Sequence, residues 1–144
     1  MKLVADSNVL FTFFWKNSAF REIVAQDVRL VSPQFALDEI DGHKEEIMNK
    51  TGINRKEFEE MLKELLQKVS FAHLDEYARF VNPALDAIQD RPQSEKDALG
   101  EDVDFLALAM KHDCLLWSND RLLKKQTKVG VVSTKELIAL IEPK

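Results

Sequence analysis

Short apolar runs alternate with amphipathic segments along this chain, and the alternation predicts strands followed by helices. The first run, residues 3–5, ends at the turn-favouring Asp6-Ser7-Asn8, after which apolar residues recur at helical spacing over 9–15 and 20–24. A β-rich run at 28–31 then ends at a Ser-Pro pair, which predicts a helix beginning just after the proline. The N-terminal part therefore reads as two successive strand-to-helix units.

The middle of the chain is dominated by charged amphipathic segments. Residues 44–68 carry apolar side chains at three- and four-residue steps, which predicts two helices forming a hairpin inserted into the domain. Asn54 lies three residues before a glutamate and predicts the start of the second helix. Beyond it we expect a short strand at 69–72, a helix at 77–88 that is interrupted or begins near Pro83, and a polar loop at 90–100.

The C-terminal third continues the alternation. Residues 103–110 predict a buried helix whose alanines allow close approach to a sheet, and 114–117 predict a buried strand. A basic helix at 121–126, a strand at 129–132 and a final helix at 134–141 complete the expected elements.

This order of elements predicts an α/β fold. Strands that alternate with helices form a parallel sheet through right-handed crossovers, with helices covering both faces. The chain has 144 residues with only four glycines and four prolines, so no linker divides it and we expect a single domain over 1–144.

Composition restricts the classes of protein that fit. The 20 basic and 25 acidic residues give a formal net charge of −5, which argues against binding nucleic acid through surface charge alone. A single cysteine excludes an internal disulfide framework and a four-cysteine zinc site. No apolar run approaches the length of a membrane span, so we expect a cytoplasmic protein without membrane association.

Four carboxylates are placed to converge in such a fold. Ligands of open parallel sheets bind beyond the carboxyl ends of the strands, where Asp6 and Asp120 directly follow two apolar runs. Glu39 and Asp102 lie near the starts of helices that reach the same edge. Clustered carboxylates repel one another unless a cation lies between them. The three histidines lack ligand spacing, so an all-oxygen site suits Mg²⁺ or Mn²⁺, ions that commonly serve phosphodiester hydrolysis.

Four segments together resemble the successive motifs of PIN-domain ribonucleases. They are residues 1–10 with Asp6, Ser32-Pro33 followed by Glu39, residues 102–109, and residues 116–120. The resemblance implies a three-layer α/β/α sandwich with a central parallel sheet. It also implies an acidic pocket that binds Mg²⁺ or Mn²⁺ and cuts RNA, a homodimer, and, as for many members, a toxin neutralised by an antitoxin protein.

The resemblance also assigns roles to individual residues. The catalytic and metal-binding acids that it implies are Asp6, Glu39, Asp102 and Asp120. Asn8 and Ser118 match positions that support the site. Asp104 leaves the third acid ambiguous; we prefer Asp102, which lies seven residues before the second alanine of its motif, while Asp104 could share the metal.

Each of these residues also has an ordinary structural interpretation. Asp6, Asp102 and Asp120 could cap helices, and Glu39 lies among acids typical of an exposed helix. The basic residues Arg121, Lys124, Lys125 and Lys128 are either a solvated face or a rim that guides phosphates. We expect the two tryptophans, Trp15 and Trp117, to serve packing rather than base stacking.

Two other functions compete with a ribonuclease. A catalytically inactive PIN-like module that binds RNA or protein would lack one of the acids, and all four are present. A receiver-like or phosphatase-like α/β domain would need a mid-chain aspartate after a strand and a lysine after a late strand, and no convincing pair occurs.

Overall fold

Five strands form one parallel sheet in the computed structural model, which describes residues 1–16 and 18–141. The strands lie in the order β3-β2-β1-β4-β5, and every neighbouring pair is parallel. Their bounds are β1 Lys2–Ala5, β2 Arg29–Pro33, β3 Val69–Ala72, β4 Leu115–Trp117 and β5 Val131–Val132. The strands expected from the sequence are therefore present, and their carboxyl ends share one edge.

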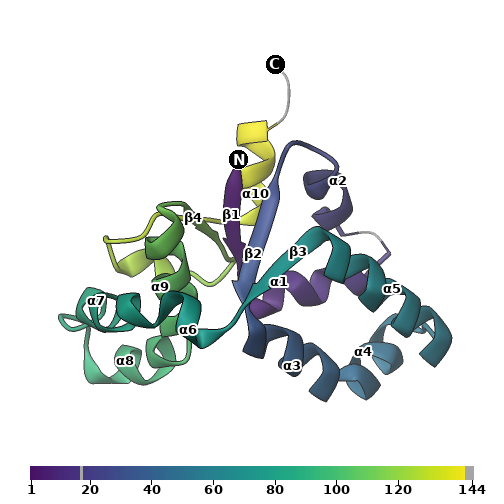
Figure 1. Ribbon diagram of the computed structural model, residues 1–144, viewed down its shortest axis with the longest axis horizontal. Coiled ribbons are helices and arrows are strands. Elements are labelled where there is room, and N and C mark those ends of the chain that lie inside the picture. Colours follow the sequence, from purple (N-terminus) through teal and green to yellow (C-terminus); the bar gives the residue numbers. More distant parts are fainter. Residues whose placement is uncertain (17, 142–144) are drawn as a thin grey trace.

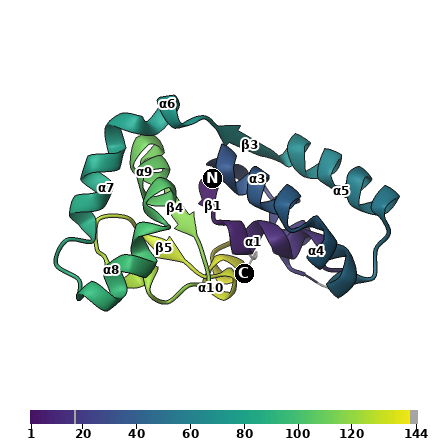
Figure 2. The ribbon, with the colours of Figure 1, turned by 90° about the horizontal axis from the view of Figure 1, so that it is seen from below.

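Helices lie on both sides of this sheet (Figures 1 and 2). One side carries α6 Leu74–Tyr77, α7 Val81–Ala87, α8 Gln93–Gly100 and α9 Val103–His112. The other carries α1 Ser7–Phe11, α2 Phe20–Val24, α3 Gln34–Gly42, α4 Lys44–Thr51 and α5 Arg55–Lys68. Helix α10 Thr134–Ile141 follows β5 and buries Leu137. The prediction of a three-layer α/β/α fold is confirmed.

β1 is the central strand because apolar side chains on both of its faces need cover. Leu3, Val4 and Ala5 have no exposed surface, and Leu3 lies opposite Leu30 of β2 and Leu115 of β4. The alanine-rich helix α9 packs against β1, β2 and β4, as its small side chains allow. One hydrophobic cluster joins the sheet to the helices on both sides.

The two helices expected over 44–68 form α4 and α5, and local capping explains their junction. Gly52 ends α4 in the left-handed conformation, with a φ of 75° that favours glycine. The Asn54 side chain accepts a hydrogen bond from the Glu57 N–H at 2.8 Å, and the Glu57 carboxylate accepts one from the Asn54 N–H at 3.1 Å. Asn54 therefore begins α5 through a complete capping box.

The predicted polar loop at 90–100 is wrong, because residues 93–100 form helix α8. Only Leu99 of this helix is buried, so its apolar pattern was too sparse to indicate a helix. The helix gains further support from Arg91, which pairs with Glu95 across one turn.

Two other boundaries differ from the sequence-based expectation. The basic helix expected at 121–126 shrinks to a single 3-10 turn, Leu123–Lys125. The helix expected at 77–88 breaks after Tyr77, continues as a 3-10 turn over Ala78–Phe80 and resumes as α7. A further 3-10 turn, Thr12–Phe14, extends α1. Among the described residues, no helix is long and apolar enough to cross a membrane.

The segment between β4 and β5 is held by a buried glutamine, which accounts for the short basic turn. The Gln126 side chain is 4% exposed. Its amide donates to the carbonyls of Leu123 and Val129 at 2.9 and 2.7 Å. Its side-chain oxygen accepts from the N–H groups of Lys128 and Val129 at 3.1 and 2.9 Å. These four bonds replace the backbone hydrogen bonds that a longer helix would supply.

Replacing this glutamine tests its structural role. We expect Gln126→Ala to lower the free energy of unfolding by about 2–4 kcal/mol, since several buried backbone groups lose their partner. Urea denaturation followed by circular dichroism measures the change. Gln93→Ala is the matched control, because Gln93 makes one exposed hydrogen bond to Asp97, and its effect stays below about 0.5 kcal/mol. Equal effects of the two substitutions would contradict the assignment.

Candidate active site

Asp6 stands where β1 passes into α1, and the sheet fixes its backbone. The Asp6 N–H donates to the Trp117 carbonyl of β4 at 3.2 Å. Its carboxylate accepts from the Val9 N–H at 2.8 Å, so Asp6 caps α1 through its side chain. The residue is only 4% exposed. Capping uses one carboxylate oxygen, so it is compatible with a second role for the other.

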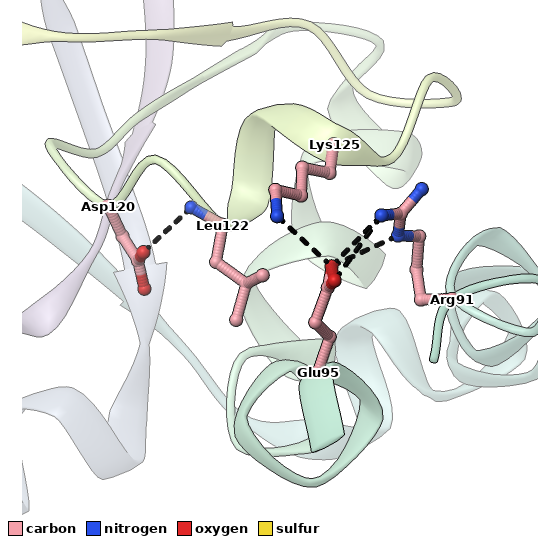
Figure 3. Close-up of polar contacts among 5 residues, drawn as sticks. All are labelled: Arg91, Glu95, Asp120, Leu122 and Lys125. Atoms are coloured by element: carbon pink, nitrogen blue, oxygen red, sulfur yellow. Dashed lines mark hydrogen bonds and ion pairs between the residues drawn. The ribbon is translucent and has the colours of Figure 1, made fainter. Parts of the chain in front are cut away.

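Asp120 reaches the same edge of the sheet from β4. Its N–H donates to the Ser118 hydroxyl at 3.1 Å, and its carboxylate accepts from the Leu122 N–H at 2.9 Å (Figure 3). Asp120 is exposed, in contrast to Asp6. The turn therefore holds this carboxylate at the solvent side of the site.

Glu39 and Asp102 approach from two helices. Glu39 lies on α3, whose start is anchored because the Ser32 hydroxyl at the end of β2 donates to the Ala5 carbonyl at 2.8 Å. Asp102 directly precedes α9 but makes no side-chain capping bond. Helix capping therefore accounts for the position of the Asp6 side chain. It does not account for that of Asp102, whose carboxylate caps no helix.

These elements bring the four predicted acids together around one pocket. The pocket has a volume of about 290 Å³ at the carboxyl end of the sheet. Its lining residues are Asp6, Ser7, Asn8, Glu39, Ala98, Glu101, Asp102, Phe105 and Asp120. Five of the nine are carboxylates, so the pocket concentrates negative charge.

The shifts in pKa show that these carboxylates repel one another. Burial, together with the negative charge of four neighbouring carboxylates, raises the pKa of Asp102 to about 7; the four are Asp6, Asp120, Glu101 and Glu39. Burial also raises the pKa of Asp6. Hydrogen bonds from the Ser118 hydroxyl and the Val9 N–H act in the opposite direction and favour the ionised form of Asp6. A positive charge in this pocket would relieve the conflict.

The supporting residues named from the sequence lie in different places. Ser118 is 1% exposed and bonds both Asp6 and the backbone of Asp120, so it links the two strand-end acids. Asn8 is exposed and lines the pocket. Asp104 does not line it; its carboxylate accepts the Tyr77 hydroxyl at 2.6 Å. Of the two candidates for the third acid, the structure brings only Asp102 to the pocket.

Glu101 is the pocket carboxylate that the sequence reasoning missed. It follows α8, a helix that was expected to be a loop, so nothing placed it near the other acids. Its position directly before Asp102 was the available signal, since adjacent residues at a helix junction can both face a site.

The donors fit a hard divalent cation in chemistry. Every polar side chain that lines the pocket offers an oxygen atom as a possible metal ligand. Asn8 carries an amide nitrogen in addition to its oxygen. The Ser7 hydroxyl oxygen is buried without a hydrogen-bond partner in the described part of the chain, so the pocket wall holds an unused polar atom. Within residues 1–16 and 18–141, no three acid, imidazole or thiol groups are already close enough to hold an ion together. Binding of a cation would therefore require the carboxylates to move closer to one another.

Two of the four basic residues after Asp120 are paired with acids. Lys125 lies 3.5 Å from Glu95, which also binds Arg91 at 3.0 Å (Figure 3). Lys124 pairs with Glu136. These contacts favour the interpretation of a solvated, ion-paired face for Lys124 and Lys125 over that of a phosphate-guiding rim.

The two tryptophans differ. Trp117 is buried, stacks on Phe20 with ring centroids 5.3 Å apart, and donates its Nε1–H to the Thr134 hydroxyl at 2.9 Å. Trp15 is 38% exposed, so the expectation of a packing role is confirmed for Trp117 and stays a prediction for Trp15.

Comparisons with known proteins agree with this architecture. The PIN domain family model matches residues 4–138. Among solved structures, the chain is similar to the crystal structure of VapBC2 from Rickettsia felis bound to a DNA fragment from their promoter. The TM-score is 0.65 at 12% identity, covering 92% of this chain and 98% of that chain. No curated protein matches the sequence. The family match spans nearly all of the sheet and the whole acidic pocket, and the chain therefore belongs to the PIN domain family.

Proposed function

We propose that this protein is a divalent-metal-dependent ribonuclease that hydrolyses RNA phosphodiester bonds. The observation that carries the proposal is the convergence of Asp6, Glu39, Asp102 and Asp120 on one pocket at the carboxyl edge of the sheet. A folded domain has little reason to confine acids that raise one another's pKa unless a cation binds there. Membership of the PIN family supports the same function.

The four acids would hold Mg²⁺ or Mn²⁺, with Glu101 adding negative charge nearby. Such an ion, when bound, activates water near neutral pH and neutralises charge on the phosphate and on the leaving oxygen. With a cation present the four carboxylates stay ionised, so their task is to bind and orient rather than to transfer protons.

The residues of the chain supply different parts of the site. Asp6 is preoriented by Val9 and Ser118, and its burial excludes water from one side of the pocket. The exposed carboxylate of Asp120 leaves the opposite side open to a polymer. Ser118 holds the two aspartates in register because it contacts both.

An inactive RNA- or protein-binding module is the alternative. All four acids are present and reach one pocket, which favours the enzyme.

A protein antitoxin and a homodimer stay predictions. The structural similarity to VapBC2, a complex bound to promoter DNA, supports a search for a protein partner of this chain. Light scattering of the purified chain, alone and with a candidate partner, measures both assemblies.

Substitutions of two pocket acids, Asp6 and Glu39, test the catalytic assignment. We expect Asp6→Asn and Glu39→Gln to lower Mg²⁺- or Mn²⁺-dependent cleavage of a labelled single-stranded RNA at least about 100-fold, because each removes a negative oxygen from the pocket. Asp38→Asn is the matched control, since Asp38 is exposed on the same helix and does not line the pocket. Full activity of Asp6→Asn with an intact fold would remove the assignment.

Thermal melting tests metal binding without relying on activity. We expect Mg²⁺ or Mn²⁺ at about ten times its Kd to stabilise the unsubstituted protein by about 1.4 kcal/mol, or roughly 3–5 °C in Tm. Asp102→Asn should melt at a higher temperature than the unsubstituted protein in EDTA, because it loses a repelled carboxylate. It should gain little from added metal.

Asp38→Asn again serves as the control and should respond to metal like the unsubstituted protein. A metal-independent Tm for the unsubstituted protein, or a metal response retained in Asp102→Asn, would argue against the proposed site.

A further inference from the structure

A groove leads away from the acidic pocket between α1, α3 and α4, which lie side by side (Figure 2). Its first part, of about 360 Å³, shares Asn8 and Glu39 with the acidic pocket. Its second part has a volume of about 670 Å³. The two parts share Asn8, Phe11, Trp15 and Lys50, so the groove is continuous with the acids.

Aromatic rings line this groove. Trp15 follows the 3-10 turn after α1 and is 38% exposed, while Phe11 lines both parts of the groove. The His43 ring lies edge-on to Phe11, with ring centroids 5.9 Å apart. Covering the exposed part of an indole ring is favourable, because it removes apolar surface from water. Aromatic faces are also the surfaces on which unpaired bases stack.

Two lysines place positive charge beside these rings. Lys50 lines both parts of the groove, and Lys16 lines the larger one. Lys50 is paired with Glu46 at 2.7 Å, but both side chains are more than half exposed, so the pair contributes little stability. A phosphate group could therefore replace Glu46 at little cost. The chain is otherwise acidic, which makes a local pair of lysines near the acids informative.

The groove also contains an unused polar group. The Ser18 hydroxyl oxygen is buried on the wall of the larger part and has no partner within residues 1–16 and 18–141. Thr12, also in the wall, uses its hydroxyl to donate to the Val9 carbonyl at 2.6 Å. A bound polymer with hydrogen-bonding sugars or bases would satisfy Ser18.

We propose that this groove holds a single-stranded segment of the RNA next to the scissile phosphodiester, with a base stacked on Trp15 and a backbone phosphate on Lys50. The inference rests on the proposed ribonuclease function, which supplies the scissile bond. Three features favour RNA as the occupant: the aromatic rings can stack on bases, the lysines can bind phosphates, and the groove is continuous with the acids. An apolar peptide would gain nothing from Lys16 and Lys50.

Binding measurements test this assignment separately from cleavage. The Asp6→Asn protein keeps the RNA intact, and fluorescence anisotropy with a short labelled oligoadenylate gives the Kd. In this background we expect Trp15→Ala to raise Kd about tenfold, the effect of losing one base stack. Lys50→Gln should raise Kd about threefold and reduce the slope of log Kd against log salt by about 0.7, the loss of one phosphate contact.

Two substitutions outside the groove are the controls. Leu74 is an exposed apolar residue on α6, and Lys63 is an exposed lysine on α5. Leu74→Ala and Lys63→Gln should leave Kd within about twofold of the background protein. Tryptophan fluorescence gives a second measurement: because Trp117 is buried, RNA should quench mainly Trp15, and Trp15→Phe should lose that quenching.

The outcomes separate the groove from the enzyme. If both groove variants bind RNA more weakly but the unsubstituted chain never cleaves RNA, the groove binds RNA and the proposed ribonuclease function is wrong. Cleavage by the unsubstituted chain, with Kd unchanged in Trp15→Ala and Lys50→Gln, would overturn the groove and leave the ribonuclease standing. In that second case a protein segment becomes the occupant to test.

Discussion

The pairing of β1 with both β2 and β4 is the constraint on which the acidic pocket depends. Three of the four residues of β1 have no exposed surface, and the chain bonds to both neighbouring strands where β1 ends: Ala5 accepts from Ser32, and the next residue, Asp6, donates to Trp117. These bonds bring together carboxylates that repel one another. The energy of burying the sheet is what holds them in one pocket, because the acids themselves oppose it.

Most of the fold could be predicted because its hydrophobic pattern is strong. The run before Asp6 and the alanine-rich segment 103–110 each had one interpretation, and both were confirmed. Helix α8 was missed because it buries Leu99 alone, so its stability comes from packing and an ion pair that the pattern does not record. The basic turn after Asp120 ended early because Gln126 bonds to four backbone groups, a tertiary arrangement without a local signal.

The candidate site followed from the rule that ligands bind at the carboxyl ends of parallel strands, which selected Asp6 and Asp120. Motif spacing already favoured Asp102 over Asp104. The hydrogen bond that occupies Asp104 comes from Tyr77, 27 residues away, and could not be predicted from the sequence. Trp15 was expected to pack because tryptophan is usually covered. Its exposure depends on how far α1 and its 3-10 turn extend, which a sequence pattern does not determine.

The topology also sets when the site can exist during synthesis. Asp6 is synthesised long before the strand that pairs beside it: β4 begins at Leu115, and β5, which accepts the Ser118 N–H, ends at Val132. The second edge of β1 therefore stays unpaired until β4, residues Leu115–Trp117, has been synthesised. A nascent chain therefore lacks a complete acid cluster until β4 and β5 have been synthesised and have paired with β1 and with each other.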